Sequence, residues 1–199
     1  CPAHCDVVCP LEIDIVTHHR EWFRPSSTSH LIHRLLPASR HHLWRRERKL
    51  TMAELRVPDR EVWILHPQGA PMPAGGAAAQ VQVVLLDGSW RETSAMAQEL
   101  SAQARVVSLP MVGESRYWLR AQADRHRFST VEALLFLLGA LGLAAAREDV
   151  GRQFELHVYA NLRARGHKEL AEEFLETSPV PAAFPELLAQ LNVARPVGP

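Results

Sequence analysis

The sequence predicts an α/β fold in which a mainly parallel sheet is flanked by helices. Short apolar runs typical of strands alternate along the chain with stretches of helical periodicity. One run, residues 81–86, is apolar almost throughout, as expected for a strand buried on both faces. Hydrophobic residues make up 47% of the 199 residues, which is enough for a buried core and argues against wholesale disorder.

The first half of the chain predicts two strands and one helix, each bounded by turn residues. Residues 11–16 alternate apolar and polar side chains like a strand, and residues 27–36 form a helix that a proline ends. Residues 62–66 are predicted as a strand that Pro67 stops. A loop rich in alanine, glycine and proline then covers residues 69–79.

The second half predicts one further strand and a largely helical C-terminal region. In order, the pattern indicates a helix, a strand, an extended segment and four helices, over residues 89–102, 106–109, 115–121, 129–146, 150–165, 168–176 and 184–192. The longest apolar run, residues 133–146, contains two glycines and is too short to span a bilayer.

The chain shows no targeting signal. No basic segment followed by an apolar one stands at the amino terminus, so we expect no signal peptide, no membrane contact and a cytoplasmic location. The sequence begins with Cys1 rather than methionine, which leaves room for residues upstream. We expect a monomer, because no stripe of apolar residues marks an interface.

Charge is unevenly distributed, although the formal net charge is zero. Bases outnumber acids over residues 16–56, and acids outnumber bases over residues 128–199. This asymmetry suits a protein that meets phosphates on one side. Residues 40–49 interleave histidine and tryptophan rings with arginines, as RNA-binding segments do, and the equally open alternative is a solvated surface helix.

Three cysteines lie within the first nine residues, namely Cys1, Cys5 and Cys9. An odd number of cysteines without a secretion signal does not predict a disulfide framework. With His4 they could hold zinc, although their four-residue steps differ from the usual spacing of zinc ligands. We therefore divide the chain into residues 1–10, which could bind a metal, and a single domain over residues 11–199.

The most informative segment follows the buried strand at residues 81–86. Asp87 places a carboxylate at the mouth of the sheet, Gly88 permits a tight turn, and Ser89 starts a helix whose first residue is Trp90. The alternative interpretation is ordinary turn and cap chemistry without a ligand.

Two predicted helices begin with a capping box, in which a hydroxyl is followed three residues later by a glutamate. The pairs are Ser89 with Glu92 and Ser129 with Glu132. Helix starts that follow parallel strands are where α/β proteins bind ligands, and their free backbone N–H groups favour anions. Both starts are therefore candidates for a binding site.

Two further segments concentrate reactive or charged side chains. Residues 114–120 hold two arginines and two aromatic residues within five positions, and the alternative is an edge strand with solvent-facing arginines. Residues 18–29 run from a strand through a polar loop into a helix cap. They begin with His18, which could also be a bystander.

Taken in order, these segments resemble the DTW-domain family. Residues 87–90 match the Asp-x-Thr/Ser-Trp signature that names it, with Ser89 where many members have threonine, which keeps the hydroxyl. The other motifs follow in the family's order, as His18-x-Arg20-Glu21 with Ser27-Thr28, His66-Pro67, Ser115-x-Tyr117-x-Leu119-Arg120 and Ser129-Thr130-x-Glu132-Ala133. The resemblance covers roughly residues 10 to 145. The amino-terminal cysteines are spaced irregularly compared with the family's cluster.

The resemblance implies transfer of the 3-amino-3-carboxypropyl group of S-adenosylmethionine to N3 of a tRNA uridine, with release of methylthioadenosine. It also implies a fold related to the knotted, SPOUT-like α/β methyltransferases, a rare topology. Asp87, Ser89 and Trp90 become the catalytic candidates. Asp87 would take the N3 proton, and the uridine would lie against the ring of Trp90.

The remaining candidates fall into two groups. We expect S-adenosylmethionine to contact Leu109, Met111, Ser115, Tyr117, Arg120, Ser129, Thr130, Glu132 and Ala133. We expect RNA to contact His18, Arg20, Arg24, Ser27, Thr28, Arg45, Arg46 and Arg116. Arg120, or the N–H groups at the Ser129 helix start, would hold the methionine carboxylate. Adenine would lie near residues 109–112 and the turn at residues 129–133.

Three other functions stay open at this level. An RNA methyltransferase on the same kind of fold would bind the same cofactor and release S-adenosylhomocysteine instead. A non-catalytic RNA-binding module would use residues 40–49 and bind no cofactor. The same transfer chemistry could also act on ribosomal RNA.

Overall fold

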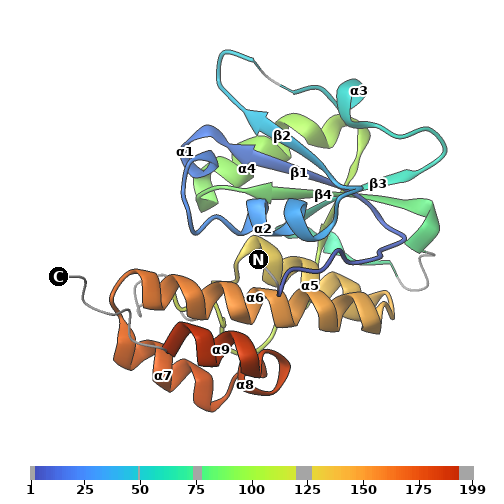
Figure 1. Cartoon of the computed structure of the whole chain (residues 1–199). Coiled ribbons are helices and arrows are strands. Elements are labelled where there is room, and N and C mark those ends of the chain that lie inside the picture. Colours follow the sequence, from blue (N-terminus) through green and yellow to red (C-terminus); the bar gives the residue numbers. More distant parts are fainter. Residues whose placement is uncertain (1–2, 49, 74–77, 120–126, 193–199) are drawn as a thin grey trace.

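A five-stranded sheet in which all strands run parallel lies at the centre of the computed structural model, which describes residues 3–48, 50–73, 78–119 and 127–192 (Figure 1). The strands lie in the order β2-β1-β4-β3-β5. Their bounds are β1 Glu12–His18, β2 Arg40–Trp44, β3 Glu61–Pro71, β4 Val81–Asp87 and β5 Arg105–Ser108. The predicted fold class, a parallel sheet flanked by helices, is confirmed.

Helices cover both faces of this sheet. Those described are α1 His19–Trp22, α2 Thr28–Leu35, α3 Met52–Leu55, α4 Trp90–Leu100, α5 Thr130–Ala140, α6 Ala144–Ala164, α7 Lys168–Glu176, α8 Val180–Ala183 and α9 Pro185–Asn192. Short 3-10 turns occupy Ala78–Gln80 and Ser101–Gln103. Helix α4 lies on one face, α2, α5 and α6 lie on the other, and α7 to α9 pack beyond α6 (Figure 1). None of the described helices is long and apolar enough to cross a membrane.

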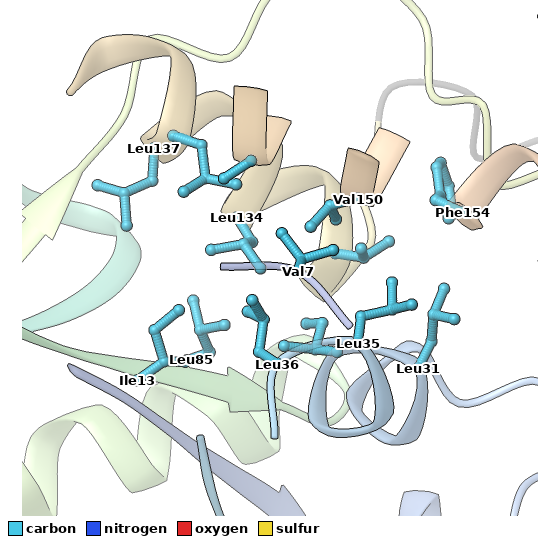
Figure 2. Close-up of a cluster of buried hydrophobic side chains, with 14 of the residues drawn as sticks. Val7, Ile13, Leu31, Leu35, Leu36, Leu85, Leu134, Leu137, Val150 and Phe154 are labelled. Atoms are coloured by element: carbon cyan, nitrogen blue, oxygen red, sulfur yellow. The ribbon is translucent and has the colours of Figure 1, made fainter. Parts of the chain in front are cut away.

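Alternation along the strands divides the core into two clusters. On β4, Val83 and Leu85 face α2 and α5, whereas Val84 and Leu86 face α4. Figure 2 shows the larger cluster, where side chains of α2, α5 and α6 meet those of β1 and β4. Val7 packs into the same cluster, and its backbone N–H donates to Leu35 O over 2.7 Å, so the segment before β1 is joined to the core.

The sheet order places a topological switch point between β1 and β4. The chain leaves β1 towards α2 on one face and leaves β4 towards α4 on the opposite face. Ligands of open α/β sheets bind where neighbouring strands send their connections to opposite sides. The carboxyl ends of β1 and β4, where Thr17 pairs with Asp87, form such a point.

A buried polar network crosses the sheet on the α4 side. Asp14 of β1 is fully buried and accepts hydrogen bonds from Arg40 at 2.7 Å, His42 at 2.6 Å and Gln82 at 2.6 Å. Gln82 also donates to Leu55 O over 2.7 Å. A buried carboxylate is tolerated because these donors replace water, and the network ties three strands to α3.

One alternative and one strand boundary expected from the sequence are wrong. Residues 40–44 form the edge strand β2 and not a surface helix, because the backbone of all five residues pairs with β1. Strand β3 does not stop at Pro67 but continues to Pro71. Its pairing with β5 shifts register between Leu65 and Ala70, so the proline falls in an irregular stretch that needs no ladder N–H.

One prediction in the second half is also wrong. The helix predicted over residues 129–146 ends at Ala140, because Gly142 turns the chain with φ +71° before α6 begins. The described part of residues 115–121, up to Leu119, forms no strand. Ala121 lies outside the described residues, and the knot that the resemblance implies stays a prediction.

Candidate active site

One carboxylate joins three elements at the carboxyl edge of the sheet. Asp87 ends β4, and its Oδ2 accepts a hydrogen bond from Ser27 Oγ over 3.2 Å. Its Oδ1 accepts one from Thr130 Oγ1 over 2.6 Å. Ser27 is the N-cap of α2 and Thr130 is the first residue of α5. The end of β4 is thus held directly against the starts of two helices.

Helix α4 begins three residues further along the chain, at Trp90, with Ser89 as its N-cap. The backbone N–H and the Oγ of Ser89 donate to Glu92 Oε2 over 2.9 and 2.7 Å, so the predicted capping box is present. The other oxygen of Glu92 lies 3.1 Å from His18 Nδ1 and 3.7 Å from Arg20 Nη1. A Cβ added at Gly88 would lie 3.4 Å from the Cβ of His18, which shows how closely the turn approaches β1.

Burial tunes the proton affinity of this His18–Glu92 pair. Burial lowers the pKa of His18, and the Glu92 charge only partly opposes this, so the imidazole is neutral near pH 7. Burial by itself raises the pKa of Glu92. The hydrogen bonds from Ser89 and the charges of His18 and Arg20 nevertheless lower its pKa, and the carboxylate stays ionised.

Trp90 stands at the rim of the site and is 53% exposed. Its ring centroid lies 5.4 Å from that of His66, the residue at which β3 becomes irregular. His66 Nδ1 accepts from Gln68 N over 3.3 Å, so its Nε2 donates to Ser94 Oγ over 3.2 Å. Burial lowers the pKa of His66. An exposed indole backed by a fixed neutral ring is a flat surface available to a ligand.

The start of α5 binds the loop that follows β5. Glu132 accepts hydrogen bonds from Ser129 N at 2.6 Å, Ser115 Oγ at 2.9 Å and Arg116 N at 2.6 Å. The hydroxyl of Tyr117 donates to Ser26 O over 2.7 Å, next to the cap of α2. The predicted cofactor residues Ser115, Tyr117, Ser129, Thr130 and Glu132 therefore lie around one helix start.

The remaining predicted cofactor residues are Ala133, Leu109, Met111 and Arg120. Ala133 continues the first turn of α5, and its N–H donates to Ser129 O over 3.0 Å. Leu109 and Met111 form a turn after β5, closed by a 2.8 Å hydrogen bond from Met111 N to Leu109 O. Arg120 lies outside the described residues.

A cavity of about 390 Å³ lies beside the start of α5. It is bounded by residues after β5, by both long helices α5 and α6, and by Pro179. Both apolar and charged side chains line it, among them Val112, Phe128, Glu132, Phe136 and Arg147. Val112 and Glu132 come from the two segments that the sequence predicts around an adenine.

The residues predicted to meet RNA fall into an exposed and a buried set. The side chains of Arg20 and Arg24 are 72% and 62% exposed, and Arg45 and Arg46 are exposed just beyond the carboxyl end of β2. Ser27 and Thr28 are buried within the site, at 5% and 4% exposure. His18 lies between these sets, paired with Glu92 as described above.

Arg116 occupies a structural position. Its guanidinium donates to both oxygens of Glu155 over 2.9 and 2.8 Å and to Thr177 Oγ1 over 2.9 Å. It also lies over the ring of Phe174, 4.2 Å from the centroid. These contacts link the loop after β5 to α6 and α7, so we leave Arg116 out of the proposed RNA surface.

The described cysteines lie outside the site. Cys5 is exposed, Cys9 is half-buried, and burial raises the pKa of the Cys9 thiol. Within the described ranges no group of three or more histidine, cysteine or acidic side chains could hold a metal ion. Cys1 lies outside these ranges, so zinc stays a prediction.

The sequence prediction missed two contacts within the site and one exposed aromatic residue. It recorded Glu92 as a cap without its contact to His18, and it gave His66 no partner. It also passed over Phe23, which is 78% exposed at the C-cap of α1 and lies between two RNA candidates. An aromatic residue flanked by arginines in a polar loop was the available signal for Phe23.

Comparison with known families agrees with the motif order. The family model described as the DTW domain matches residues 1–163. No curated protein and no solved structure matches the chain.

Proposed function

The chain belongs to the DTW-domain family, and from this premise we propose that it transfers the 3-amino-3-carboxypropyl group of S-adenosylmethionine to N3 of a uridine in tRNA, with release of methylthioadenosine. The observation that carries the proposal is the convergence of Asp87 with the starts of α2 and α5, beside the start of α4. Asp87 closes β4 at the switch point between β1 and β4, and α/β proteins bind ligands at such points.

The chemistry requires control over which carbon reacts. Nitrogen must attack the methylene carbon attached to sulfur and not the methyl group, so the sulfonium has to be held in one orientation. Fixed orientation of this kind can lower a barrier by ~7–11 kcal/mol. The hydrogen bonds of Asp87 and Glu132 fix the starts of α2 and α5 relative to the loop after β5, which supports such positioning.

The donor has complementary groups around the start of α5. Helix α5 has eleven residues, and the N–H groups of Thr130 and Val131, which its capping box does not use, favour a carboxylate such as that of the methionine part. The neighbouring cavity offers the rings of Phe128 and Phe136 to an adenine. This arrangement would bring the sulfonium between the cavity and Asp87.

The acceptor would approach from the arginine-bearing side. Arg20, Arg24, Arg45 and Arg46 follow the carboxyl ends of β1 and β2, and all four are exposed. Phosphate contacts by such residues orient an RNA without reading its sequence. The exposed face of Trp90 then suits a uridine turned out of its stack.

Product analysis tests this proposal. Purified protein is incubated with tRNA and S-adenosylmethionine, and both the nucleosides and the small-molecule product are measured by mass spectrometry. We expect aminocarboxypropyl-uridine together with methylthioadenosine. Methylated nucleoside with S-adenosylhomocysteine would identify a methyltransferase instead. Absence of donor binding in a calorimetric titration would indicate an RNA-binding module, and product formed only on ribosomal RNA would change the acceptor.

A further inference from the structure

The transfer needs a proton acceptor, and Asp87 is already engaged. The N3 atom of uridine carries a proton at neutral pH, and this proton has to leave as the new N–C bond forms. Both carboxylate oxygens of Asp87 accept hydroxyl hydrogen bonds, from Ser27 and Thr130. These bonds make Asp87 a positioning residue for two helix starts. The proton acceptor is therefore sought among the other bases at the carboxyl edge of the sheet.

His18 is such a base, at the end of the strand next to Asp87. Its Nδ1 lies 3.1 Å from the ionised Glu92, whereas the N–H of Arg20 approaches the same nitrogen only to 3.4 Å. A ring nitrogen cannot both donate and accept, and the shorter contact to a charge assigns the proton to Nδ1. Nε2 is then the basic nitrogen, and no described residue occupies it.

The position of His18 fits a base that faces the acceptor. Thr17 pairs with Asp87 in the sheet, so His18 stands beside Gly88, the turn between Asp87 and Ser89. Its partner Glu92 lies in the first turn of α4, two residues after Trp90. The first turn of α4 therefore carries both the exposed ring of Trp90 and the carboxylate that contacts the imidazole.

We propose that His18 Nε2 removes the N3 proton of the acceptor uridine, and that Glu92 holds the imidazole in the tautomer that does so; this inference rests on the proposed function. The N3 electron pair forms the bond to the methylene carbon next to sulfur. The C–S bond breaks, and its electron pair stays on sulfur, which becomes the neutral thioether of methylthioadenosine. The imidazolium then releases its proton to water.

The surroundings of His18 favour this role. Burial and the neighbouring charges of His19 and Arg20 lower the pKa of His18, while Glu92 raises it, and Asp87 lies across the Gly88 turn. The net lowering keeps Nε2 unprotonated at neutral pH, as a proton acceptor requires. The rate should then fall as the pH drops through this lowered pKa.

The test compares pH profiles of single-turnover transfer in four proteins: the wild type, His18→Gln, Glu92→Gln and the matched control His19→Gln. His19 is exposed, and its ring lies 4.3 Å from that of His18. General-base catalysis contributes about 10²- to 10⁴-fold, so His18→Gln should lose at least about 100-fold and also its acid limb. Glu92→Gln keeps the cap but removes the charge that raises the pKa of His18, so the acid limb should move to lower pH. His19→Gln should retain the acid limb.

Two further measurements keep the result interpretable. Calorimetric binding of S-adenosylmethionine should stay within about threefold in every variant, since no variant removes a proposed donor contact. NMR titration of the His18 imidazole should show protonation at a lower pH in Glu92→Gln than in the wild type, whether or not the variant is active. Thermal unfolding checks that each variant folds.

The outcomes separate this inference from the function on which it rests. A wild type that transfers no aminocarboxypropyl group at any pH contradicts the proposed function. An active wild type whose acid limb persists unchanged in His18→Gln overturns the role of His18 and leaves the function intact. If His18→Gln does not fold, an unshifted acid limb and imidazole titration in Glu92→Gln overturn the inference by themselves.

Discussion

Single side chains at the carboxyl edge of the sheet decide how the protein could work. Asp87 and Glu132 are carboxylates whose oxygens are filled by hydroxyl and backbone donors. His18 and Glu92 form a pair in which one ring nitrogen has no partner among the residues that the structure describes. Asp87 and Glu132 fix the positions of helix starts and loops, whereas the His18–Glu92 pair is suited to move a proton. We therefore expect different effects on transfer when these carboxylates are replaced.

Replacing Asp87 with alanine should reduce transfer by at least about 100-fold. The hydroxyls of Ser27 and Thr130 would lose their shared acceptor, and misplacement of reacting groups by about 1 Å costs on the order of 10² in rate. Donor affinity, measured by calorimetry, should change little. Asp149→Ala on α6 is the control, because Asp149 pairs with Arg152 of the same helix. Full activity of Asp87→Ala would remove this residue from the account.

Replacing Trp90 with alanine should weaken the use of tRNA without affecting donor binding. Stacking of a base on an aromatic ring is worth ~1–3 kcal/mol, and 53% of Trp90 is exposed to receive one. The expected result is a higher KM for tRNA, whereas Trp90→Phe keeps a ring and should retain most of the affinity. Equal loss in both variants would speak against stacking.

The motif residues of the site could be predicted from sequence, and their pairing could not. Asp87 and the two capping boxes follow from strand ends and helix starts, which are local patterns. The contact of His18 with Glu92 joins residues that are far apart in the chain and depends on strand order. Arg116 looked like an RNA contact because its charge was visible, whereas its partner Glu155 was not.

At the scale of elements, the contact between β3 and β5 depends on one glycine. A Cβ at Gly69 would lie 2.6 Å from the backbone of Val106 and Val107. Gly69→Ala should therefore lower the free energy of unfolding by ~1–3 kcal/mol, as overpacking commonly does. Urea unfolding measures it. Gly151→Ala on α6 is the matched control, because its Cβ would meet only Leu135 at 3.8 Å, and a helical alanine should stabilise slightly. A neutral Gly69→Ala would refute the close approach.

The capping box of α5 should contribute more to stability than that of α3. Ser129→Ala should cost ~0.5–2 kcal/mol. Glu132→Ala should cost more than Ser129→Ala, because it also leaves Ser115 Oγ and the Arg116 N–H without their acceptor. Thr51→Ala, in the exposed box of the four-residue α3, is the comparison and should cost least. The same order must appear in urea midpoints, and an inverted order would contradict it.

Elements with a clear apolar period were predictable, and those shaped by neighbours were not. The apolar run of residues 81–86 predicts strand β4. Strand β2 contains Arg40 and two histidines. It forms a strand because its backbone pairs with β1 and because Asp14 binds polar side chains of β2. The break between α5 and α6 occurs at Gly142, which has a positive φ. Because the apolar run continues through this glycine, hydrophobic periodicity does not predict the break.

On the scale of the whole molecule, the exposed arginines should govern salt-dependent RNA binding. Arg45→Ala with Arg46→Ala should reduce the slope of log affinity against log salt by about 1.4–1.8, because each phosphate contact contributes about 0.7–0.9. Filter binding of tRNA across a salt series measures this. The control pair, Arg60→Ala with Arg105→Ala, lies at the amino ends of β3 and β5, the opposite edge of the sheet. Equal slopes in both double variants would rule out the proposed face.

The fate of two carbons of the donor tests the central claim most directly. Two preparations of S-adenosylmethionine are used, one labelled in the carboxyl carbon and one in the methyl carbon, and label is counted in tRNA uridine after digestion. The account predicts that the carboxyl label enters uridine while the methyl label leaves with methylthioadenosine. Entry of the methyl label into RNA, with the carboxyl label left in solution, would contradict it.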